Sequence, residues 1–421
     1  MSAADAAPLQ GPSMKRRLLG FLLVPAIAAL SPLIALPAVV QIAGASGWAS
    51  AIAGESIGTF AAIAIGWGWA TIGPALISIA ADDDERARLY RESIAVRLMI
   101  SIIALPALGV ICWFIASPGS EWLTVLMGAQ GALIALSFTW FCAGVGDPKT
   151  IVIFDAAPRL IANLAAAGLV LMTGVVVLYP LAGIAVTLIG TGLFTMRLLR
   201  RHPGPWPRPR DIPALLRSNL SVALNDAGLS GYSSVPAPVV NVTASASAAG
   251  GYATADKMLK LGQFIPMTLA NALQAWIGEA HGAHRGRRMG VALVLAAGAG
   301  LIGWAGLALV GPWLTSTFLP AAPAPFDILL VMGLVFFFFS VRTAVARLVL
   351  FPAGQAGAVM RATLIATALG IPLMIGLALV WGPLGAALGY AFTEGAATLL
   401  LARRCFRVLR DLRHAPSEAP V

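Results

Sequence analysis

Charged residues are scarce in this sequence. They make up 11% of the 421 residues, and the mean hydropathy is +0.86, whereas an average soluble domain is about one-quarter charged. Apolar runs of roughly 20 residues, long enough to cross the hydrocarbon of a bilayer, recur between residues 18 and 402. The scarcity of charge therefore excludes an ordinary soluble domain and predicts an all-α, polytopic membrane protein.

Cysteine and the motifs of soluble chemistry are also nearly absent. The three cysteines, Cys112, Cys142 and Cys405, lie within or just past apolar runs and form no CxxC pair, so we expect neither disulfides nor a metal site. The stretch AGVGDPKT at 143–150 lacks the spacing of a phosphate-binding loop. The longest predicted external connection, 314–325, carries no constellation of acid, base and nucleophile. We therefore expect neither an enzyme nor a cofactor.

The apolar runs predict about twelve transmembrane helices. Lys and Arg cluster at the N-terminus, in every second connection and at the C-terminus, and the alternate connections carry none. The positive-inside rule therefore predicts that both termini face the cytoplasm of a bacterial-type plasma (inner) membrane. The net charge of +10 is explained mostly by this topology, so no nucleic acid partner is expected. The predicted spans are 18–41, 49–80, 93–116, 122–142, 158–178, 180–199, 215–242, 250–280, 289–313, 326–350, 360–381 and 384–403.

An internal duplication is visible at an offset near 203 residues. PLAGIAVTLIGTGLFTMRLLRR at 180–201 aligns with PLGAALGYAFTEGAATLLLARR at 383–404, and GWASA at 47–51 aligns with GYATA at 251–255. Because each half has six spans, both halves enter the membrane from the same side, as parallel repeats do. The predicted organisation is two six-helix bundles around a central cavity, with these segments: an N-terminal cytoplasmic tail 1–17, a bundle 18–199, a basic Pro-rich cytoplasmic linker 200–214, a bundle 215–404 and a C-terminal cytoplasmic tail 405–421.

The stretch GWASAIAGESIGTFAAIAIGWGWATIGPALISIA at 47–80 has a distinctive pattern of small and aromatic residues. It resembles the second span of polysaccharide-biosynthesis flippases, which belong to the superfamily of multidrug, oligosaccharidyl-lipid and polysaccharide exporters. The residues that carry the resemblance are Gly47, Trp48, Gly58, Gly66, Trp67, Gly68 and Gly73, together with the repeat copy that begins at Gly251-Tyr252.

The resemblance implies alternating-access transport of a polyprenyl pyrophosphate-linked oligosaccharide from the inner to the outer leaflet, in surface polysaccharide biosynthesis. Its implied partners are this substrate, membrane lipids, and a polysaccharide polymerase or glycosyltransferases. Two alternatives stay open. One is a cation-coupled exporter of drugs or organic cations from the same superfamily, and the other is a non-transporting membrane scaffold built on the same fold.

Ionisable side chains within the predicted spans are the candidate site residues, because each costs at least ~2.5 kcal/mol to place at the bilayer centre. Arginine and lysine suit phosphate oxygens, so a pyrophosphate site is predicted from Arg342, Lys257, Lys260 and Arg347. Arg342 and Arg347 point about 140° apart on a helix, so they require different partners, and Arg347 has the alternative of reaching the interface.

Acidic side chains and one amide form a second set of candidates. They serve either in coupling to H+ or Na+ or as structural partners of the cations: Asp226, Glu55, Glu394 and Asn225. Glu55 and Asp226 are the predicted counter-charges of Lys260.

The sign of the unpaired charge in the cavity distinguishes the candidate functions. A pyrophosphate carrier needs unpaired Arg or Lys, whereas an exporter of organic cations needs unpaired acids near the midplane. The sequence contains both signs. Because the cations are slightly deeper and more numerous, we predict the flippase.

Overall fold

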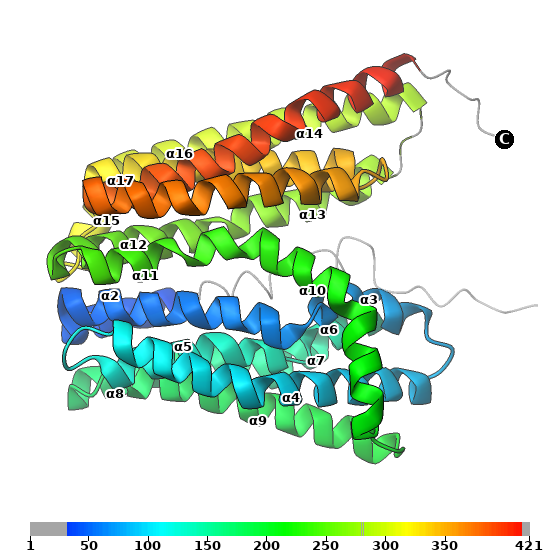
Figure 1. Ribbon diagram of the computed structural model, residues 1–421, viewed down its shortest axis with the longest axis horizontal. Coiled ribbons are helices and arrows are strands. Elements are labelled where there is room, and N and C mark those ends of the chain that lie inside the picture. The colour runs from blue at the N-terminus through cyan, green and yellow to red at the C-terminus, as the bar shows by residue number, and fades with distance from the viewer. Residues whose placement is uncertain (1–31, 279, 281, 415–421) are drawn as a thin grey trace, which may run out of the picture.

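The computed structural model describes residues 32–278, 280 and 282–414, and these residues form a bundle of helices (Figure 1). In a bilayer an α-helix satisfies its own backbone hydrogen bonds, which is why so apolar a chain adopts this structure. The α-helices are α2 (Pro32–Gly66), α3 (Trp69–Ile79), α4 (Asp83–Ile115), α5 (Glu121–Leu133), α6 (Thr139–Val145), α7 (Pro148–Ile151), α8 (Ala157–Thr173), α9 (Leu178–Arg201), α10 (Ile212–Ser234), α11 (Pro236–Thr243), α12 (Ala246–Gly262), α13 (Phe264–Gly278), α14 (Gly282–Ala305), α15 (Gly311–Phe318), α16 (Phe326–Ala344) and α17 (Ala356–His414). Short 3-10 or π segments join some of them: η1 (Ile134–Leu136), η2 (Val152–Ala156), η3 (Pro209–Asp211), η4 (Gly306–Val310) and η5 (Val345–Leu350).

Eight of the described helical segments are long and apolar enough to cross a membrane, which confirms the prediction of an all-helical polytopic membrane protein. The count of twelve stays a prediction, since most of the first predicted span lies outside the described residues. The eight segments are Ile34–Ile79, Asp83–Ile115, Glu121–Val145, Pro148–Thr173, Leu178–Arg201, His284–Phe318, Phe326–Leu350 and Ala356–Leu412.

The longest helix, α17, contains a reversal at Gly382. Gly382 has φ 59° and ψ −139°, a backbone conformation that L side chains rarely adopt. A Cβ on Gly389 would lie 2.4 Å from Met374 Cα, and a Cβ on Gly370 would lie 2.0 Å from Thr393 Oγ1. These antiparallel contacts show that the two arms of α17 form a tight hairpin, with glycine at the points of closest approach.

Two layers of helices are visible in Figure 1. Helices α2 to α9 form one layer, α11 to α17 form the other, and α10 passes from the first to the second. The chain between α9 and α10 is extended apart from the single turn η3, in the segment predicted as a linker. The second arm of α17 runs on as helix to His414, past the predicted end of the second bundle at residue 404.

Helices α2 and α12 connect the two layers. Trp48 Nε1 donates a hydrogen bond to Thr254 Oγ1 at 3.0 Å, and a Cβ on Gly250 would lie 2.8 Å from Ala45 Cβ. These contacts run in the same direction along both helices, at a separation close to the predicted repeat offset. Segments that the predicted duplication would relate therefore face each other, and the duplication itself stays a prediction.

Candidate functional site

Two lysines on α12 lie at the contact between the layers. Lys257 Nζ is 2.6 Å and 2.7 Å from the two carboxylate oxygens of Glu55 on α2. Lys260 Nζ donates to Ser56 Oγ at 3.1 Å and forms an ion pair with Asp256 Oδ2 at 2.7 Å. The spacing of three residues places both lysines on one face of α12, toward α2. Charged contacts therefore join the two layers beside the Trp48–Thr254 hydrogen bond.

Lys260 forms no ion pair with either of its predicted partners, Glu55 and Asp226. Lys260 pairs with Asp256, one helical turn before it on α12, and Glu55 pairs with Lys257. Asp226 on α10 instead accepts a hydrogen bond from Thr71 Oγ1 on α3, at 2.7 Å. The side chain of Asn225 lies outside the described residues.

Arg342 lies in a closed polar cluster between α10, α16 and α17. Its Nε is 2.7 Å from Glu394 Oε2, and its Nη2 is 3.2 Å from Glu394 Oε1 and 2.9 Å from Tyr232 Oη. Tyr232 in turn donates to Glu394 Oε1 at 2.7 Å. The Glu394 side chain is 1% exposed and that of Arg342 is 12% exposed, so this is a buried and fully paired charge.

Arg347 lies in η5 and contacts a different helix. Its Nη1 donates to Asn271 Oδ1 on α13 at 2.7 Å. Arg342 and Arg347 thus have separate partners, as their angular separation predicts. A role for either in binding substrate stays a prediction.

The expectation that the deep cations are unpaired is wrong for this conformation. Arg342, Lys257 and Lys260 each form an ion pair with a carboxylate. Their partners come from helices that pack beside them or from the preceding turn, and the sequence alone does not indicate which faces meet.

A cavity of about 420 Å³ lies between the first layer and α10. Helix α10 closes one side of it, since Asp226 is bonded to Thr71 on α3 and Trp67 Nε1 donates to the carbonyl of Leu216 at 2.9 Å. The polar lining consists of hydroxyls, one carboxylate and one guanidinium: Thr59, Thr71, Ser137, Thr139, Ser230, Asp226 and Arg97.

Arg97 is a site residue that the sequence analysis missed. It belongs to α4, which begins early because Asp82 caps the helix by accepting a hydrogen bond from the backbone amide of Glu85. Arg97 therefore lies about 21 Å along the helix from its first residue. Arg97 falls inside the predicted span 93–116, and that position within a span is the signal that identifies it.

The surroundings of Arg97 are carbonyl groups and an aromatic ring. The chain breaks from α5 through η1 to α6, and Arg97 Nη1 donates to the carbonyls freed there, Ala135 O at 2.7 Å and Ser137 O at 3.0 Å. Its guanidinium lies over the Trp140 ring, 5.6 Å from the centroid. Arg97 is 1% exposed, its Nη2 has no partner among the described residues, and no described carboxylate forms an ion pair with it. It is thus a buried cation whose charge is not neutralised by an acid.

Comparison with solved structures shows the fold. The chain superposes on the lipid II flippase MurJ in an inward closed conformation with a TM-score of 0.69, at 13% identity, covering 93% of this chain and 90% of that one. It superposes on an inward-facing MATE family multidrug resistance transporter of the MOP superfamily with a TM-score of 0.61, at 16% identity and 94% and 100% coverage. For the MATE multidrug transporter DinF-BH the TM-score is 0.62, at 16% identity and 96% and 98% coverage.

The chain therefore has the fold that these flippase and transporter structures share. No family model and no curated protein matches it, so membership of the polysaccharide-biosynthesis flippases stays a prediction. Among the described residues, no three His, Cys, Asp or Glu side chains gather to hold a metal ion.

Proposed function

We propose that the protein is a membrane transporter that moves an anionic, polyprenyl pyrophosphate-linked saccharide between leaflets by alternating access. The observation that carries the proposal is Arg97, a buried guanidinium that borders the cavity and has no described carboxylate partner. Such a charge favours an anion, and hydroxyl groups around it offer further donors to phosphate or saccharide oxygens. The fold supports the transport class, since the superposed proteins are a lipid flippase and multidrug transporters.

In this proposal the halves of the protein separate at the contacts between α2 and α12. Alternating access requires an interface between the two halves that can close on one side of the membrane and open on that side later in the transport cycle. The Lys257–Glu55 pair and the Trp48–Thr254 hydrogen bond hold this interface closed here. The two lysines contact a head group only after the interface opens. Arg97, which borders the cavity, is the first cation that meets the substrate.

Reconstitution tests the proposal. In proteoliposomes that contain a fluorescent polyprenyl pyrophosphate disaccharide, we expect the wild type to translocate the lipid and Arg97→Gln to lose more than about tenfold in rate, since a charge-assisted hydrogen bond is removed. Arg97→Lys keeps the charge and is expected to retain part of the activity. Arg88→Gln is the matched control, because Arg88 is on the same helix but its side chain is 57% exposed and paired with Glu85.

Two results would refute the proposal. If the Arg97→Gln variant folds and transports at the wild-type rate, the charge of Arg97 is not needed for transport and the proposal loses its main support. Wild-type protein that exports an organic cation but leaves the pyrophosphate lipid untouched would establish the cation-exporter alternative.

A further inference from the structure

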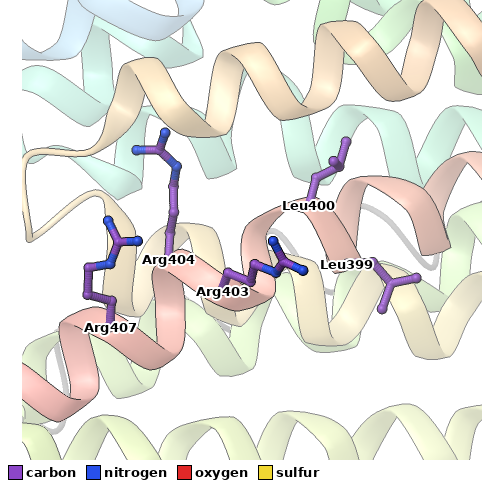
Figure 2. A pocket seen from close by; sticks show the side chains of 5 residues that line it. All are labelled: Leu399, Leu400, Arg403, Arg404 and Arg407. Carbon is purple, nitrogen blue, oxygen red and sulfur yellow. The ribbon is translucent and has the colours of Figure 1, made fainter.

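Three arginines gather near the end of α17, outside the cavity described above. Arg403, Arg404 and Arg407 line a pocket of about 480 Å³ together with Leu399 and Leu400 (Figure 2). Figure 2 shows the side chains of Arg404 and Arg407 extending to the same side of the helix, with Arg403 lying along it toward the leucines. All three arginines are exposed.

The charges in this pocket have no partner among the described residues. No described residue forms a hydrogen bond or an ion pair with the side chains of Arg403, Arg404 or Arg407, in contrast to Arg410, which lies 3.9 Å from Asp411. Three guanidinium groups repel one another when they share a pocket without an anion, so the arrangement favours a ligand that carries negative charge. Phosphate oxygens suit it best, because the planar guanidinium forms paired bonds to them.

Apolar residues one turn earlier specify what the phosphate is attached to. Leu399 is 69% exposed and Leu400 is 46% exposed, and both lie just before the arginines in the segment Ala356–Leu412, which is long and apolar enough to cross a membrane. A ligand in this pocket therefore meets hydrocarbon-facing side chains at one end and cationic groups at the other. We propose that the pocket binds the phosphate head group of an anionic phospholipid, with its acyl chains against Leu399 and Leu400.

The two predicted repeats differ at this position, and the difference shows that the arginines are more than the usual excess of positive charge at cytoplasmic helix ends. Arg200 and Arg201 at the end of α9 are the counterparts of Arg403 and Arg404 at the predicted offset. Helix α9 ends there, and Gly204 stands where the second copy has Arg407. The positive-inside rule accounts for the arginine pair in both copies. The continued helix and the third arginine occur in the second copy alone, and they complete the pocket.

The position of the pocket argues against a role in translocation. The end of α17, red in Figure 1, lies at the outer edge of its layer, on the side away from the layer that contains Arg97. A lipid bound there belongs to the surrounding leaflet rather than to the transport path. The site can therefore fail its test without affecting the proposed function.

Lipid retention by the full-length protein in detergent is the test. Native mass spectrometry counts bound dioleoyl phosphatidylglycerol, with dioleoyl phosphatidylcholine as the comparison lipid without net charge. We expect Arg407→Gln to weaken phosphatidylglycerol binding about tenfold, as for the loss of one charge-assisted hydrogen bond. The triple change of Arg403, Arg404 and Arg407 to Gln is expected to reduce it to the level of phosphatidylcholine. If the triple variant does not purify intact, the single exposed change Arg407→Gln decides the question.

The matched control is Arg200→Gln with Arg201→Gln, which removes charge at the counterpart position and is expected to leave affinity unchanged. If this control weakens phosphatidylglycerol binding as much as Arg407→Gln does, or if Arg407→Gln leaves the affinity unchanged, the proposed lipid site is wrong. Millimolar inorganic pyrophosphate is the soluble comparison. It is expected to displace little lipid because the leucines hold the acyl chains, and complete displacement would overturn the assignment to a lipid.

Discussion

Removal of the charge on Glu394 is expected to destabilise the helices around Arg342. Glu394 accepts from Arg342 at 2.7 Å and 3.2 Å and from Tyr232 at 2.7 Å, and its side chain is 1% exposed. In Glu394→Gln the amide nitrogen faces a donor, so one of these bonds is lost and the guanidinium keeps its charge without a counter-charge. Breaking one partner of a buried pair costs about 3–5 kcal/mol.

The size of the coupling between Arg342 and Glu394 can be measured by a double-mutant cycle. Reversible unfolding in mixed micelles would be followed for Arg342→Gln, Glu394→Gln and the combination of both. We expect a coupling free energy above about 2 kcal/mol, because the second change removes the charge that the first leaves unpaired. Arg347→Gln is the control, since Arg347 donates to an amide and its loss is expected to cost about 1 kcal/mol. A coupling free energy below about 0.5 kcal/mol would show that Arg342 and Glu394 do not stabilise the protein as a pair, and the assignment of Arg342 to a structural ion pair would be wrong.

Further changes test the interface and the hairpin. Lys257→Gln removes the ion pair with Glu55, and we expect it to raise the maleimide labelling rate of a cysteine placed at Ala45 about fivefold to tenfold. This factor corresponds to a loss near 1 kcal/mol for a partly exposed ion pair. A labelling rate equal to that of a Lys149→Gln control would show that the pair does not hold the layers together. Gly389→Ala places a Cβ 2.4 Å from the backbone of the facing arm of α17 and is expected to lower the unfolding temperature by several degrees, whereas Gly376→Ala, with no atom within 4 Å, is expected to have little effect. Equal unfolding temperatures in these two variants would contradict the tight hairpin.

Local patterns in the sequence predicted the helices and several of their ends. Apolar runs and polar connections locate most of the helix boundaries, because these depend on residues close together along the chain. The reversal at Gly382 also agrees with the predicted connection between the last two spans. The break between α5 and α6 was not predicted, since no proline or charge marks it and Arg97, from another helix, satisfies the carbonyls that it frees.

The partners of the charges could not be predicted in the same way. Glu394 is 52 residues from Arg342 and Tyr232 is 110 residues from it, so their contact depends on how α10, α16 and α17 pack. Lys257 and Glu55 are 202 residues apart and meet because two parallel helices face each other. Nothing local distinguishes these paired cations from Arg97, whose nearest acceptors are backbone carbonyls.

Composition and periodicity were thus sufficient to establish a helical membrane protein and to locate the charges that its spans carry, since the cost of burying charge and backbone in lipid acts on each segment separately. Which of those charges are neutralised, and which of them line a cavity, was settled by the packing of distant helices. The reason is that an ion pair requires two side chains to meet within a few ångströms, and that distance is a property of the assembled bundle rather than of any one span.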